Sequence, residues 1–193
     1  MENMLELIKS RRTIRKYLSE QIKDEELNAI VEAGLYAPSA GGRQNPKFLI
    51  IQNEDILQKL GIINRNAYGK ATSDNIRYIS KNQPSIADTN DIKTGFYNAP
   101  TVIAIFAPRS WCYAVHDCTM AAESMTLMAW SLGIGSCYVS RSEETFDTDY
   151  GREIMKQAGI EEDYEAKVFL TLGYPDGEIG NAKPRKENKI VKI

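Results

Sequence analysis

Residues 117–132 read DCTMAAESMTLMAWSL, and this stretch decides the fold. It is predicted to be a helix that is apolar on nearly every side, and Gly133 follows where a glycine can end it. Such a helix must be buried on several faces. At about 16 residues, with Asp117 and Glu123 in it, the helix is too short and too polar to span a bilayer. A subunit interface is therefore a natural place for part of its surface.

Strands and further helices are expected on both sides of this helix in the sequence. The run at residues 101–107 is β-branched and apolar on both faces, which is typical of a central strand. Leu27, Ile30 and Val31 recur at the spacing of an amphipathic helix. The other expected elements are strands at residues 48–51, 137–139 and 168–172 and helices at residues 2–10, 24–36 and 150–158.

The composition limits the classes of protein that fit this chain. Its 193 residues, 42% of them hydrophobic, suffice for one substantial core, so a single domain over residues 1–193 is expected. The 26 acidic and 24 basic residues leave a formal net charge of -2, which favours neither nucleic acid nor a membrane as a partner. The start of the chain lacks the basic-then-apolar order of a signal peptide, so a cytoplasmic location is the expectation.

The cysteines and the histidine give little support for metal or thiol chemistry. Cys112, Cys118 and Cys137 form no C-x-x-C pair, and one histidine is too few for a conventional zinc site, so no metal is expected. Buried, reduced thiols are favoured, with a redox role for Cys137 as the alternative. His116 is interpreted as structural, with a proton donor as the alternative. Glu123 either pairs across a subunit interface or lies exposed.

Residues 54–98 are more polar than the rest and show only weak helical periodicity. They also contain scattered tyrosines, namely Tyr68, Tyr78 and Tyr97. This composition predicts a segment that covers a site instead of building the core.

Two basic clusters and one loop supply the groups that hold a phosphate. Residues 11–16 read RRTIRK and residues 183–186 read KPRK, and either cluster alone is typical of a solvated surface. The loop at residues 38–46 reads PSAGGRQNP and carries two glycines that can take positive φ. Together the three segments offer guanidinium groups, hydroxyls and backbone N–H groups, which predicts that they converge on one phosphate.

The chain resembles the FMN-dependent nitroreductase family in five ordered motifs. The motifs are SRRTIRKY from residue 10, EAGLYAPSAGGRQNP from residue 32, NAPTVIAIF from residue 98, DCTMAAESMTLMA with LGIGSCYV, and LTLGYP with KPRK. Only residues 54–98 and 141–165 carry no recognisable motif of the family.

The resemblance implies an α+β fold, in which a mostly antiparallel central sheet is flanked by helices, and an intertwined homodimer with FMN at the subunit interface. It also implies roles for particular residues. The phosphate and ribityl contacts would be Arg11, Arg12, Thr13 and Arg15, with Lys183 and Arg185 as a C-terminal phosphate clamp. The flavin ring would lie against Pro38, Ser39 and Ala40, and Gln44 and Asn45 would reach it across the dimer. A backbone N–H would meet the flavin N5 at Tyr138, Val139 and Ser140.

The sequence also departs from the family pattern. Thr13 stands where serine is commoner, which keeps the hydroxyl, whereas Gly42 stands where many relatives have a ring-contacting asparagine. Asn45 is the candidate substitute for that asparagine. No glutamate-glycine pair follows Val139, so only backbone contacts are expected near N5.

The activity that the resemblance implies is an NADH- or NADPH-dependent reduction of nitroaromatics, quinones, enones or flavins. Hydride would pass through the flavin N5 in a ping-pong cycle, and no catalytic side chain is required. The chain has no glycine-rich dinucleotide fingerprint after a strand, which suits a nicotinamide that binds only transiently. The alternatives are a reductive dehalogenase, an azoline dehydrogenase, a flavin-fragmenting enzyme, or a non-catalytic protein that stores FMN.

Overall fold

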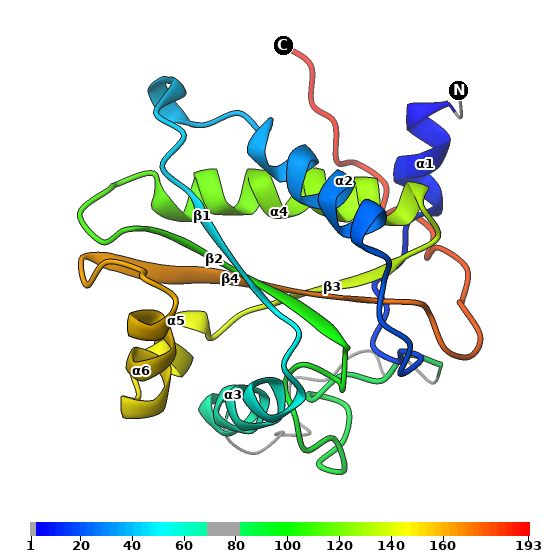
Figure 1. Ribbon diagram of the computed structural model, residues 1–193. Coiled ribbons are helices and arrows are strands. Elements are labelled where there is room, and N and C mark those ends of the chain that lie inside the picture. The colour runs from blue at the N-terminus through cyan, green and yellow to red at the C-terminus, as the bar shows by residue number, and fades with distance from the viewer. Residues whose placement is uncertain (1–2, 69–81) are drawn as a thin grey trace.

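The computed structural model describes residues 3–68 and 82–193, whose central layer is an antiparallel sheet (Figure 1). Its strands are β1 (Lys47–Ile51), β2 (Thr101–Pro108), β3 (Gly135–Val139) and β4 (Tyr164–Gly173), in the order β1-β2-β4-β3. All three pairings are antiparallel. Strand β2 is central and buried along nearly its whole length, as its apolar character on both faces predicts. The expected antiparallel α+β fold is confirmed.

Helices cover both faces of this sheet. They are α1 (Met4–Ser10), α2 (Asp24–Leu35), α3 (Glu54–Ala67), α4 (Ala114–Ser131), α5 (Ser142–Phe146) and α6 (Asp149–Gln157), with a short 3-10 turn, η1 (Ala40–Gly42). In Figure 1, α2 and α4 lie on one side of the sheet, and α3, α5 and α6 lie on the other. A separate hydrophobic cluster fills each side.

The first cluster forms where α2 and α4 pack together on the sheet. Ile30 from α2 and Met125 from α4 are fully buried there. The two helices approach closely because Gly34 has no side chain; a Cβ at this position would lie 2.1 Å from the terminal methyl of Met125. The glycine is thus explained by packing between helices.

The second cluster corrects the prediction for residues 54–98. Leu57 and Leu60 of α3 are buried in it, and the ring of Phe96 packs edge-on against Phe169 at a centroid distance of 4.7 Å. This part of the chain therefore helps to build the core. Although this part of the chain is polar overall, α3 has one apolar stripe, which is enough to hold the helix against the sheet. Tyr78 lies outside the described residues.

Helix α4 begins one turn earlier than predicted and is buried on only one side in the single chain. Its other face exposes Val115 and Met120, at 52% and 46% of their surface. The apolar face of α1, with Leu5 and Ile8, is also exposed. Glu123 is exposed in the single chain. No helix within residues 3–68 and 82–193 is both long and apolar enough to cross a membrane.

Candidate functional site

The N-terminal basic segment lies beside β3, one of the two edge strands of the sheet. After α1 ends, the chain runs extended, so that Thr13 forms a parallel bridge with Ser136. The Ile14 N–H donates to the Ser136 carbonyl at 2.9 Å, and the Ile14 side chain is fully buried. This residue fixes the segment to the core, while Arg11 and Arg15 on either side of it stay partly exposed.

The C-terminal segment runs back along the N-terminal one. After β4, the Asp176 N–H donates to the Lys16 carbonyl at 2.9 Å. Farther along, Nε of Arg12 donates to the Gly180 carbonyl at 3.2 Å. These contacts bring the two ends of the chain, and therefore the two basic clusters, to the same place.

Both clusters face one cavity of about 650 Å³. The six residues that the sequence assigns to phosphate binding all line it, namely Arg11, Arg12, Thr13, Arg15, Lys183 and Arg185. A third segment contributes Asn82, Gln83, Ser85 and Asp88. Among the described residues of this lining Asp88 is the one acidic residue, and its carboxylate accepts the Ser85 N–H at 2.6 Å. The cavity thus has five cationic side chains against one anionic side chain.

The guanidinium of Arg12 is largely committed to the protein. Nη1 donates to the carbonyls of residues 9–11 at 2.7 to 3.0 Å, at the end of α1. Since the last carbonyls of a helix lack intrahelical partners, Arg12 caps α1 while its Nε holds the C-terminal segment. Arg12 therefore has fewer N–H groups left for a ligand than its predicted role as a phosphate or ribityl contact requires.

Arg15 retains a donor for a ligand. Its Nη1 donates to the Gln83 carbonyl at 3.1 Å, and its guanidinium lies 5.9 Å from the centre of the Tyr97 ring. Its Nε is buried and has no hydrogen-bond partner among the described residues. An unsatisfied buried donor on a cation is costly, and a nearby anion would offset that cost.

Two titratable side chains near Arg15, those of Cys137 and Tyr97, do not neutralise its charge. Burial raises the pKa of the Cys137 thiol, and the nearby Arg15 guanidinium offsets this only in part. Burial likewise raises the pKa of Tyr97 to about 12. Both side chains are therefore neutral at neutral pH, so the cavity keeps its positive charge. The raised pKa also favours the structural interpretation of Cys137, since a protonated thiol is a poor nucleophile.

The loop at residues 38–46 is held by α4. Gly41 and Gly42 both take φ of 64°, as the paired glycines predict. The Ala40 N–H donates to Oδ1 of Asp117 at 2.9 Å, and Nε1 of Trp111 donates to Oδ2 of the same carboxylate at 2.8 Å. The guanidinium of Arg43 lies 4.7 Å from the centre of the Trp111 ring. One buried carboxylate thus ties the loop to the start of α4.

This loop does not meet the basic clusters within one chain. It lines a different cavity, of about 640 Å³, to which Pro38, Ser39 and Gln44 contribute and which contains none of the six predicted phosphate residues. In Figure 1 the η1 loop lies at the far end of α4 from α1, where the basic segment begins. The prediction that all three segments converge on one phosphate is therefore wrong for the single chain, because the length of α4 separates them.

The end of β3 is fixed by α3. Tyr138 is exposed, whereas Val139 is buried. The Tyr68 hydroxyl lies 2.6 Å from Oγ of Ser140 and accepts the Ser140 N–H at 3.2 Å. Nδ2 of Asn64 donates to the Ser140 carbonyl at 2.9 Å. All the polar groups of Ser140 are thus held by the C-terminal end of α3.

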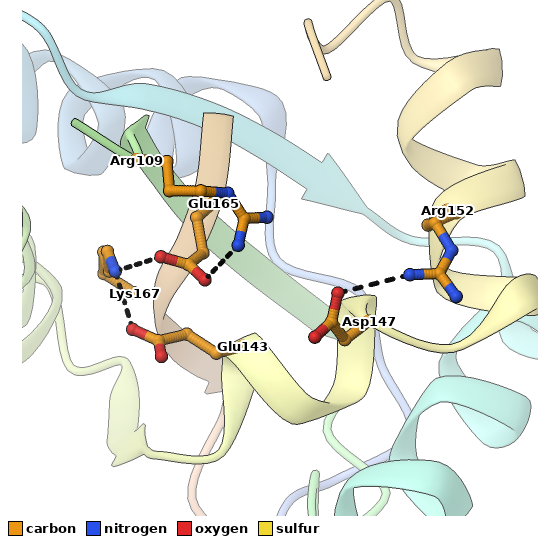
Figure 2. A network of polar contacts seen from close by, with 6 residues as sticks. All are labelled: Arg109, Glu143, Asp147, Arg152, Glu165 and Lys167. Atoms are coloured by element: carbon orange, nitrogen blue, oxygen red, sulfur yellow. Dashed lines mark hydrogen bonds and ion pairs between the residues drawn. The ribbon is translucent and has the colours of Figure 1, made fainter. Parts of the chain in front are cut away.

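A third cavity, of about 780 Å³, lies near α5 and α6 and contains none of the residues that the sequence assigns to the site. Beside it, Lys167 lies between Glu143 and Glu165, Arg109 pairs with Glu165, and Arg152 pairs with Asp147 (Figure 2). Each of these cations already has a carboxylate partner, and among its described residues the lining of this cavity has seven acidic side chains against three basic ones, which does not suit an anionic ligand.

Sequence reasoning missed Gln83, Trp111 and Asp117. Gln83 is buried at the junction of three segments, and Asp117 is a buried carboxylate in the first turn of a helix otherwise buried through apolar side chains. A carboxylate in the first turn of an apolar helix is the feature of the sequence by which Asp117 could have been identified. His116, by contrast, is exposed, with its ring at the edge of Tyr113.

Comparisons with known proteins agree with this architecture. The model of the Nitroreductase family matches residues 8–174. A protein of Archaeoglobus fulgidus, whose name assigns it provisionally to the NADH dehydrogenases or NAD(P)H nitroreductases, is 29% identical over 183 residues, which cover 92% of this chain and 88% of that protein.

Two solved structures extend the likeness over the whole chain. A nitroreductase with bound FMN from Bacteroides fragilis has a TM-score of 0.82 and 30% identity, with 100% of both chains covered. A nitroreductase with bound FMN from Desulfitobacterium hafniense has a TM-score of 0.81 and 26% identity, again with 100% of both chains covered.

Proposed function

This chain belongs to the nitroreductase family of oxidoreductases, and on that premise we propose that it binds FMN and transfers electrons from NADH or NADPH to a small oxidised acceptor. One observation carries the proposal. The two ends of the chain bring five cationic side chains to one cavity, where Arg15 holds a buried donor without an acceptor.

The lining of this cavity fits a phosphate monoester. Such a group carries nearly two negative charges and three acceptor oxygens, and guanidinium groups bind it through paired N–H donors. Arg11, Arg15, Lys183 and Arg185 would hold the phosphate, and the Thr13 hydroxyl would add a donor. Arg12 would act mainly by fixing α1 and the tail, because its Nε and Nη1 already have partners.

The ring of the cofactor requires a second copy of the chain. The loop at residues 38–46 and the basic cavity lie in separate regions of one subunit, so a homodimer is proposed in which each FMN is held by the cavity of one subunit and the loop of its partner. The exposed apolar faces of α1 and α4 support this arrangement, since an exposed apolar face usually marks an interface. Pro38, Ser39 and Ala40 would lie against the ring, with Gln44 and Asn45 beside them.

The end of β3 would contact the ring from the subunit that holds the phosphate. Backbone groups of Tyr138 and Val139 are proposed to meet it. The N–H and the carbonyl of Ser140 already bond Tyr68 and Asn64, so Ser140 would fix the end of the strand instead of contacting the ring. FMN, when bound, supplies the two-electron chemistry, so the protein has to bind, orient and exclude water. Tyr68, next to Ser140, would then help to choose the acceptor.

The first test is the identity of the bound flavin. The purified protein is expected to be yellow and to release FMN, not riboflavin or FAD, when it is denatured. Chromatography of the released flavin measures this directly. A protein that remains free of flavin after incubation with excess FMN would overturn the proposal.

A further inference from the structure

Gln83 is buried, with only 5% of its surface exposed, at the junction of the three segments that line the basic cavity. Its Oε1 accepts two consecutive backbone N–H groups, from Arg15 at 2.6 Å and from Lys16 at 2.9 Å. Its Nε2 donates to the Asp176 carbonyl at 3.2 Å, and its own carbonyl accepts from Nη1 of Arg15 at 3.1 Å. One side chain therefore joins the N-terminal segment to the C-terminal one, and its backbone holds the guanidinium.

The neutral charge of this side chain matters as much as its contacts. The five cations of the cavity repel one another, and a carboxylate beside Arg15 would relieve that repulsion but would also remove positive charge that an anionic ligand needs. An amide avoids this loss, because it supplies a strong acceptor without a negative charge. A carboxylate at the same place would also accept the two N–H groups, but it would offset the charge of Arg15 and could not donate to Asp176.

We propose that Gln83 is the positioning residue for phosphate recognition, holding Arg15 and the C-terminal segment in place while leaving the positive charge of the cavity for the ligand. This inference rests on the proposed function. Its distinctive consequence is that Gln83 acts on the phosphate and not on the flavin ring. FMN and riboflavin differ in that phosphate, so the ratio of their affinities reports the role directly.

The test compares FMN with riboflavin on the full-length protein and on three variants. Gln83→Leu removes all the side-chain hydrogen bonds, and Gln83→Glu keeps the shape and the acceptor oxygens but adds a negative charge. In both, FMN affinity is expected to fall by about tenfold, with riboflavin affinity changed by less than about twofold. Gln21→Leu is the matched control, because Gln21 bonds the Pro100 carbonyl and the Thr101 hydroxyl, away from the basic cavity.

The outcomes separate the inference from the proposed function. If the ratio of FMN affinity to riboflavin affinity is unchanged in both Gln83 variants, whether or not both affinities fall, the positioning role is overturned while the proposed function stands. If Gln83→Leu fails to fold, the ratio measured for Gln83→Glu decides alone. A wild-type protein that binds FMN no more tightly than riboflavin would overturn the phosphate site itself.

Discussion

Arg15 and Arg185 reach the same cavity from segments at opposite ends of the chain. Replacing either by alanine is expected to weaken FMN binding by about 1.5–3 kcal/mol, or roughly ten- to a hundredfold, because a charge-assisted hydrogen bond is lost. Titration of the flavin-free protein with FMN, followed by flavin fluorescence, measures the change. Arg109→Ala is the matched control, since its guanidinium pairs with Glu165 outside the cavity. A double variant with unchanged FMN affinity would contradict the assignment.

The basic residues of the site were predictable from sequence, and their supports were not. Charge density draws attention to residues 11–16 and 183–186, and the resemblance to the nitroreductase family gives these residues their predicted role. Gln83 gave no signal because its partner Arg15 is 68 positions away, and a lone glutamine between Asn82 and Pro84 has no distinguishing pattern. The hydrogen bond from the Ala40 N–H to Asp117 likewise spans 77 positions, so the sequence does not reveal this partner. Such contacts depend on tertiary placement, which local sequence does not encode.

At the scale of elements, the strands and helices with strong periodicity were predicted within a few residues. Strand β2 was evident from its β-branched run, and α2 from its apolar spacing. Helix α3 was missed because only Leu57 and Leu60 are deeply buried among its apolar residues, so polar composition outweighed its periodicity. The predicted convergence of the loop at residues 38–46 with the basic clusters is wrong within one chain, because nothing in the sequence gives the distance that α4 sets between them.

Because residues 54–68 and 82–98 help to build the core, Phe96 and Tyr68 are expected to have different roles. Phe96 is 1% exposed and packs on Phe169, so Phe96→Ala should lower the free energy of unfolding by about 3–5 kcal/mol and affect the acceptor only indirectly. Tyr68→Ala, next to Ser140, should instead alter the relative turnover of different acceptors more than it alters FMN retention. Denaturant unfolding and steady-state kinetics with several acceptors measure the two effects.

Tyr68→Phe serves as the control for that comparison, because it keeps the ring and removes only the hydroxyl that bonds Ser140. Acceptor preference that is the same in Tyr68→Ala, Tyr68→Phe and the wild type would count against a role for this end of α3 in acceptor choice.

At the scale of the whole molecule, the separation of the loop from the basic cavity makes a dimer necessary for the proposed site. Met120→Glu places a charge on the exposed apolar face of α4 and is expected to produce monomers that lose FMN together with the interface. Sedimentation velocity at micromolar concentration measures the state of assembly. Ile62→Glu is the matched control, since Ile62 is exposed to the same 46% but lies on α3, across the sheet (Figure 1). A wild-type monomer that retains FMN would contradict the shared site.

The central claim, that the protein accepts electrons from a nicotinamide and passes them on, is tested most directly by an anaerobic titration. The yellow protein is mixed with NADH or NADPH, freed of nicotinamide by gel filtration, and then mixed with a quinone or a nitroaromatic, while the flavin absorbance is recorded. The account predicts bleaching by the donor alone and recovery of the colour on addition of the acceptor, because donor and acceptor use the same place in turn. A flavin that neither nicotinamide bleaches would contradict the account and would indicate a protein that stores FMN.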